Sequence, residues 1–83
     1  MDEKKFEDLK MRISSNCDVA ASCYHDYSKP SDGYNITRHE LGFNIYLRIY
    51  SFVENLRDFY LISPEQYQEL KVLYKDVYDL YLG

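Results

Sequence analysis

The sequence predicts an all-α fold, a small bundle of three helices, or of four if the first helix breaks in its middle. Three segments carry apolar residues at helical spacing, and two of them open with a helix-start signal. These patterns place helices at about 3–26, 38–61 and 64–82, in a single domain that spans all 83 residues. A loop at 28–36 and a tight corner at 61–63 join the helices.

The first predicted helix keeps one apolar face along its whole length. The residues of this face recur every three or four positions: Phe6, Leu9, Ile13, Cys17, Ala20 and Tyr24. The segment "SSN" consists of weak helix formers, but the apolar residues keep their helical spacing on either side of it. We therefore favour one helix, in which Ser15 marks the place for any kink; the alternative is a break there, with Ser15 or Asn16 capping a second short helix.

The central helix is expected to start at about Arg38. Thr37 can cap its first turn, Glu40 can return a hydrogen bond, and Ile36 and Leu41 can close a hydrophobic staple. One wide apolar arc then contains Leu41, Ile45, Tyr46, Ile49, Phe52, Val53, Leu56, Phe59 and Tyr60. A smaller group nearly opposite contains Phe43, Leu47, Tyr50 and Leu61. We expect this helix to be the most buried element, or to carry a contact surface on its second side.

The last helix opens with the same signal. Ser63 and Gln66 form a capping box, Pro64 takes the first helical position, and Ile62 faces Tyr67 as the staple. The inward stripe of this helix contains Leu70, Leu73, Val77 and Leu80. One flank carries a ridge of tyrosines: Tyr67, Tyr74, Tyr78 and Tyr81.

Cysteine and histidine spacing does not favour a metal site or a catalytic site. Cys17, Cys23, His25 and His39 could supply four zinc ligands, but five residues separate the cysteines, whereas zinc sites usually take their first two ligands from a tight turn. On a helix the two thiols point about 120° apart and lie roughly 9 Å apart along the axis, which excludes a disulfide. Cys23 and His25, two residues apart, do not face each other on a helix. We expect no enzyme activity, metal or other cofactor, and a solvated His39.

The charge distribution disfavours nucleic acid as a partner. Counting Lys and Arg against Asp and Glu, the net charge of −4 divides into −2 for 1–27, zero for 28–62 and −2 for 63–83. Binding to phosphates requires clustered basic residues, and no segment is basic. The opening "MDEKKFEDLK" has no apolar run behind it, and no apolar stretch is long enough to span a bilayer. We expect a cytoplasmic protein without a membrane partner.

Tyrosine is the most informative residue type, because ten are present and tryptophan is absent. Tyrosines at the border of a helical stripe ordinarily pack their rings inward and leave their hydroxyls in water. Tyrosine is also enriched at protein interfaces, because it offers a large and stiff contact area. The candidate partner-binding residues are Tyr46, Tyr50, Tyr67, Tyr74, Tyr78 and Tyr81.

Two functions fit these observations. The first is a non-enzymatic inhibitor or adaptor that covers a surface of a larger protein through its tyrosine-rich helical face. In size, acidity and composition, though in no diagnostic motif, the chain resembles accessory and inhibitor proteins encoded by phages and other mobile elements. The alternative is a self-associating homodimeric structural or regulatory subunit. A DNA-binding regulator is the third, and the charge disfavours it. If the first holds, Tyr74→Ser and Tyr78→Ser should abolish partner capture and leave melting nearly unchanged.

Overall fold

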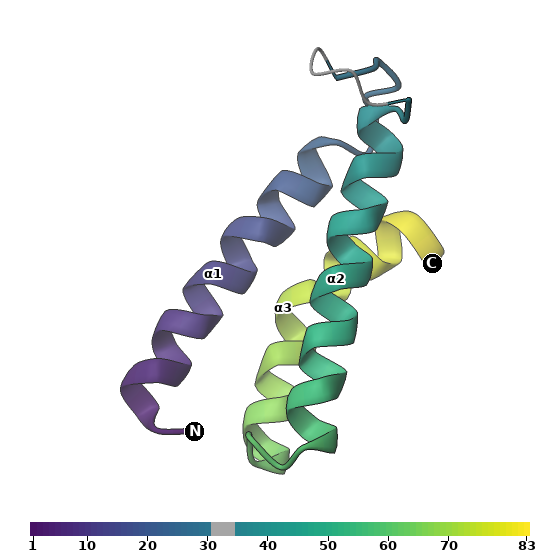
Figure 1. The fold of residues 1–83 in the computed structure, drawn as a ribbon. Coiled ribbons are helices and arrows are strands. Elements are labelled where there is room, and N and C mark those ends of the chain that lie inside the picture. Colours follow the sequence, from purple (N-terminus) through teal and green to yellow (C-terminus); the bar gives the residue numbers. More distant parts are fainter. Residues whose placement is uncertain (31–34) are drawn as a thin grey trace.

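The computed structural model describes residues 1–30 and 35–83, and it confirms the predicted fold class. The described residues form three helices: α1 (Glu3–Ser22), α2 (Arg38–Asp58) and α3 (Pro64–Leu82). α2 and α3 run antiparallel and are joined by a short corner, and α1 packs against both of them (Figure 1). Each helix contacts the other two, so the molecule is a small helical bundle.

α1 is one continuous helix through the "SSN" segment. The Asp2 side chain caps it by accepting a hydrogen bond from a first-turn amide. Within the helix, Asn16 Nδ2 donates to the Arg12 carbonyl oxygen at 2.8 Å, so the helix accommodates this polar side chain without a break. The alternative in which Ser15 or Asn16 starts a second helix is therefore not seen in the part of the chain that the structure describes.

The first helix ends at Ser22, about four residues before the predicted end. The amides of Tyr24 and Asp26 donate to the carbonyl three residues back, as in turns, at 3.2 and 3.1 Å. His39, at the start of α2, is hydrogen-bonded to both residues. Its ring Nδ1 bonds to the Tyr24 carbonyl, and its backbone amide donates to the Asp26 carbonyl. These long-range hydrogen bonds hold the segment after α1 against the start of α2, in turns rather than in a further helical turn. Of the predicted loop, residues 31–34 lie outside the described residues.

The predicted helix starts of α2 and α3 are confirmed at Arg38 and Pro64. Thr37 Oγ1 accepts from the Glu40 amide at 3.1 Å, while the return hydrogen bond from Glu40 is not formed within the described residues. The box before α3 is complete, because Ser63 and Gln66 each accept from the other's backbone amide, at 3.1 and 3.0 Å. The corner thus passes directly into a well-capped helix.

α2 ends at Asp58, before the predicted end at 61, in a turn that glycine usually makes. Tyr60 has a φ of 59°, in the left-handed region. The Leu61 amide donates to the Leu56 carbonyl at 2.9 Å, and the Tyr60 amide donates to the Arg57 carbonyl at 3.0 Å. This pair of hydrogen bonds is the Schellman motif, which satisfies the last carbonyls of a helix. The sequence did not signal it because the left-handed position holds tyrosine rather than glycine.

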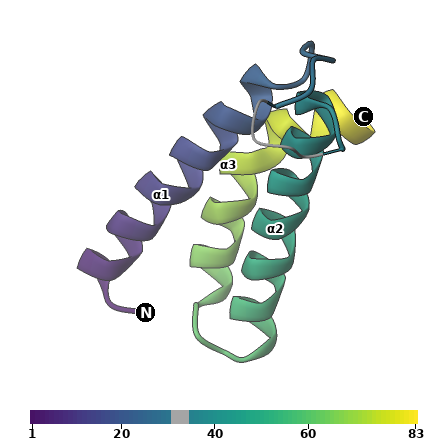
Figure 2. The same ribbon diagram turned by 45° about the horizontal axis from the view of Figure 1, so that its top comes forward.

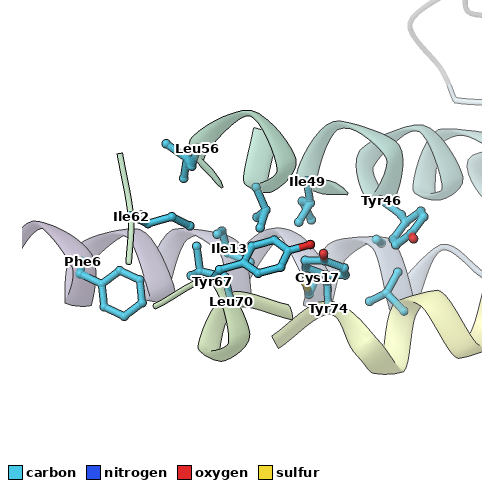
Figure 3. Close-up of a cluster of buried hydrophobic side chains, with 13 residues drawn as sticks. Phe6, Ile13, Cys17, Tyr46, Ile49, Leu56, Ile62, Tyr67, Leu70 and Tyr74 are labelled. Atoms are coloured by element: carbon cyan, nitrogen blue, oxygen red, sulfur yellow. The ribbon is translucent and has the colours of Figure 1, made fainter. Parts of the chain in front are cut away.

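The core runs between all three helices, as Figure 3 shows for part of it. Its buried side chains are Phe6, Ile13, Cys17, Ala20, Tyr46, Ile49, Val53, Leu56, Ile62, Tyr67, Leu70, Tyr74 and Val77. The predicted arc of α2 is wrong at its C-terminal end, because the chain leaves the helix there and exposes Phe59 and Tyr60. Phe52 in the same arc, and Leu80 in the α3 stripe, are also exposed. None of the described helices is long and apolar enough to cross a membrane.

Candidate functional site

The six tyrosines expected to face a partner do not form one surface. Three of them lie in the core: Tyr46, Tyr67 and Tyr74, with exposed fractions of 2%, 8% and 5%. Tyr50 and Tyr78 are each 44% exposed. The expected ridge is therefore part core and part surface. α2 packs against the side of α3 that carries Tyr67 and Tyr74, so these two rings lie in the core.

A groove of about 470 Å³ lies between α2 and α3, with exposed and buried tyrosines on its walls. Its lining residues are Tyr46, Tyr50, Gln68, Lys71, Val72, Tyr74, Lys75, Tyr78 and Asp79. The Tyr46 ring lies 6.1 to 6.3 Å, centroid to centroid, from the rings of Tyr50, Tyr74 and Tyr78. Four of the six predicted tyrosines therefore meet in this groove. Because buried Tyr46 and Tyr74 support the exposed rings, the aromatic surface is preorganised.

The Tyr67 hydroxyl lies below the surface in a hydrogen-bonded network with charged groups. It donates to Glu54 Oε1 at 2.5 Å and accepts from Arg57 Nη1 at 3.2 Å. Arg57 Nη2 forms an ion pair with Glu54 Oε2 at 2.8 Å, and the guanidinium lies 4.8 Å from the centroid of the Tyr67 ring. The hydrogen bond to Glu54, followed by burial, raises the pKa of Tyr67 above its ordinary value. This network ties α2 to α3 close to the corner.

Tyr74 is buried like Tyr67, but its hydroxyl has no hydrogen-bond partner among residues 1–30 and 35–83. Burial raises the pKa of Tyr74 strongly. A buried hydroxyl without a hydrogen-bond partner costs stability, so the Tyr74 hydroxyl lowers the free energy of unfolding relative to a ring without it.

Tyr81 lies away from the groove, in a cluster of rings at the other end of the bundle. Its hydroxyl donates to the Ala20 carbonyl at 2.9 Å and so joins α3 to α1. Its ring lies 5.1 Å from Tyr24 and 5.2 Å from His39, and Tyr27 stacks on His39 at 4.7 Å. The prediction of a solvated His39 is wrong, because these rings and the Tyr24 carbonyl surround it and leave it half-buried. No sequence spacing indicated the cluster, since Tyr24 and Tyr27 follow the end of α1.

The cysteines are free thiols in the interior. Cys17 and Cys23 are both buried, and burial raises the pKa of Cys17 to about 11. A thiol with such a pKa carries little of the nucleophilic thiolate at neutral pH. In the described part of the chain, no three His, Cys, Asp or Glu side chains are grouped as metal ligands would be.

The corner between α2 and α3 is a second unusual surface, although the apolar spacing of α2 predicted that Phe59 and Tyr60 belong to a buried arc. Its three consecutive large side chains, Phe59, Tyr60 and Leu61, are 71%, 93% and 53% exposed. Figure 2 shows the corner at the lower end of the bundle, where α2 passes into α3. Large apolar side chains clustered in water contribute little to a fold and are typical of interaction sites.

Comparison with models of protein families, with curated proteins and with solved structures gave no match to this chain.

Proposed function

We propose that the protein is a non-enzymatic binding protein, an inhibitor or adaptor, which covers a surface of a larger protein with the α2–α3 face. The observation that carries the proposal is the groove, in which half-exposed Tyr50 and Tyr78 stand on buried Tyr46 and Tyr74. Binding energy at interfaces is concentrated in aromatic residues that are held rigidly and lose few rotamers on contact. The groove offers such residues next to apolar Val72, which is 71% exposed.

The neighbouring side chains extend the same face along α2. Leu47 is 40% exposed. Because it precedes Tyr50 by three residues, it lies on the same side of α2. On α3 the groove wall includes Lys71 and Lys75, whose positive charges form a polar rim. An apolar, aromatic centre with a charged rim is the usual composition of a protein interface.

Site-specific photocrosslinking in the source cells tests this proposal. A photoreactive amino acid at position 78 should form a covalent adduct with one larger protein, and the Tyr50→Ser change should abolish that adduct. Position 27 is the control, since Tyr27 is 67% exposed and lies outside the groove. Equal labelling from both positions, or an adduct indifferent to Tyr50→Ser, contradicts the proposal.

Tyr50→Ser and Tyr78→Ser are suitable variants because their rings are already half in water. We expect each to cost at most about 1 kcal/mol of stability, well below the cost of removing a buried ring. Tyr74→Ser, which sequence reasoning treated as a surface change, is unsuitable because Tyr74 is a core residue. Loss of binding in that variant would be confounded with loss of folding.

A further inference from the structure

The corner residues Phe59, Tyr60 and Leu61 form a convex apolar projection on a rigid base. The two Schellman hydrogen bonds fix the backbone on one side, and the Ser63–Gln66 capping box fixes it on the other. The left-handed φ of Tyr60 is a conformation that glycine adopts without strain and that costs energy for a bulky residue such as tyrosine. Glycine would make the same turn without strain, so what tyrosine adds here is the exposed ring itself.

The groove is a concave surface and the corner is a convex one. Both are formed by α2, α3 and the segment that joins them. The lining of the groove includes the half-exposed rings of Tyr50 and Tyr78, with the buried rings of Tyr46 and Tyr74 behind them. A projecting phenol is suited to this site, because its ring can pack edge-to-face on the half-exposed rings of Tyr50 and Tyr78.

The charges beside the two surfaces are complementary. The corner is flanked by Asp58, with a side chain that is 59% exposed, and by Glu65 in the first turn of α3. Arg57 lies 3.4 Å from the Asp58 carboxylate, so the three side chains together carry one net negative charge.

Lys71, Lys75 and Asp79 line the groove and give it one net positive charge. Lys75 pairs with Asp79 at 2.9 Å, whereas Lys71 lies 5.3 Å from the Tyr67 ring centroid and has no ion pair within residues 1–30 and 35–83. A carboxylate that arrives with the corner would therefore meet an available ammonium group.

We propose that the corner of one copy of this chain occupies the groove of a second copy. The Tyr60 ring then packs between Tyr50 and Tyr78, and the Asp58 carboxylate faces Lys71. The inference rests on the proposed function in one respect, that the groove is a protein-binding surface. It names a second copy as an occupant of that surface, in competition with the larger protein.

The spacing of the two surfaces allows the contact to be reciprocal. The corner and the middle of the groove are separated by about a dozen residues of α2, which is roughly 18 Å along the helix axis. Two copies in antiparallel orientation can therefore insert both corners at once. A reciprocal contact closes the assembly at a dimer, whereas a one-way contact would propagate into chains.

Sedimentation equilibrium of the full chain, over a range of concentrations, tests the contact. We expect a reversible dimer, and association weaker by about tenfold or more for Tyr60→Gly. Because Tyr60→Gly relieves backbone strain, its melting temperature at low concentration should be at least that of the wild type. Tyr27→Ser, at an exposed tyrosine outside both surfaces, should associate as the wild type does.

A charge exchange provides the second measurement. Asp58→Lys and Lys71→Glu should each weaken the dimer, and the double variant should restore it.

A wild-type chain that stays monomeric overturns the inference, as does a dimer indifferent to Tyr60→Gly or a double variant without rescue. A monomer that still crosslinks a larger protein from position 78 overturns only this inference. A dimer that forms no such adduct overturns only the proposed function.

Discussion

Tyr67 and Tyr74 are equally buried tyrosines on one helix, and their hydroxyls differ in what they contact. The Tyr67 hydroxyl bonds to Glu54 and Arg57, while that of Tyr74 has no partner in the described residues. Removing a hydroxyl that satisfies a partly buried carboxylate leaves that carboxylate short of a donor, whereas removing an unpartnered hydroxyl relieves a desolvation cost.

We therefore expect Tyr67→Phe to lower the free energy of unfolding by about 1–3 kcal/mol. Tyr74→Phe should leave it unchanged or raise it by up to about 1 kcal/mol. Urea unfolding of both variants, which keep the ring and differ from wild type by one oxygen each, provides the measurement. Equal losses would show that the Tyr74 hydroxyl has an acceptor. Tyr74→Ser, in contrast, should cost about 3–5 kcal/mol because it removes a core ring.

The left-handed backbone of Tyr60 has an energetic cost that glycine would avoid. A non-glycine residue in this conformation costs about 1–2 kcal/mol, and glycine recovers most of that while making the unfolded chain more flexible. Tyr60→Gly should raise the free energy of unfolding by about 0.5–1 kcal/mol, as measured by thermal unfolding at low protein concentration. Tyr60→Ala is the control, because it removes the ring and keeps the strain. If both variants had the same stability, the strain would be absent.

Sequence reasoning identified the tyrosines but could not divide them between core and surface. Tyr74 and Tyr78 stand four residues apart on one flank of α3, yet one is 5% and the other 44% exposed. The difference depends on how far α3 is rotated toward α2, which is a property of the packed pair. A helical pattern fixes which residues share a face, but not where on that face the neighbouring helix lies.

At the scale of the helices, the starts and the end of α3 at Leu82 were predictable, whereas the ends of α1 and α2 were not. Side-chain caps at Thr37 and Ser63 are local signals that act within four residues, and both were read correctly. α1 ends where His39, far along the chain, takes the carbonyls of Tyr24 and Asp26. α2 ends at a tyrosine in a position where glycine is the usual signal. The residues at the ends of α1 and α2 therefore carry no local signal that the helix stops there.

Gly42 controls how closely the helices approach one another. A Cβ at this position would lie 2.8 Å from Cys23 Cβ and 2.9 Å from the Ala20 carbonyl oxygen, and it would also overlap the Tyr81 hydroxyl. The Tyr81 side chain can move, whereas the backbone of α1 can move only if the helix shifts. Alanine is the better helix former by about 1 kcal/mol, so propensity alone predicts stabilisation.

We expect the steric effect to exceed that gain, so that Gly42→Ala lowers the free energy of unfolding by about 1–3 kcal/mol. Ser51→Ala is the matched control, because Ser51 is exposed on the same helix and its change should stabilise by a few tenths of a kcal/mol. Denaturant unfolding of the two variants separates propensity from packing. A Gly42→Ala variant as stable as wild type would mean that α1 and α2 are free to move apart.

For the whole molecule, the all-α class and the three-helix arrangement followed from periodicity and caps, because both are repeated along the chain. The groove could not be predicted in the same way. It depends on Tyr46 and Tyr50 from α2 meeting Tyr74 and Tyr78 from α3, and no local pattern records that juxtaposition. The corner was missed because its residues continue the apolar spacing of α2 after the helix itself has ended.

The interior contains a thiol and several phenols that are neutral when protonated and become negatively charged when they lose the proton. Burial raises the pKa of the Cys17 thiol from 9.0 to about 11. Four tyrosines also have raised pKa values, chiefly from burial and for Tyr67 first from its hydrogen bond to Glu54: Tyr46, Tyr67, Tyr74 and Tyr81. In the unfolded chain these groups titrate at ordinary values, so at alkaline pH the unfolded state loses protons that the folded state retains. Stability is therefore fully present below pH 9 and falls as the pH rises through 9 to 11.

Melting temperatures measured across that range should decline, first from the thiol and then, from about pH 10, from the phenols. Tyrosinate absorbance should show some phenols ionising in the folded protein and the buried ones ionising only together with unfolding. Cys17→Ala should flatten the early part of the decline, whatever its effect on stability at neutral pH, because it removes the thiol whose pKa burial raises from 9.0 to about 11. A melting temperature constant to pH 11 would require these side chains to be hydrated in the folded state, and would contradict the packing of α1 on α2 and α3.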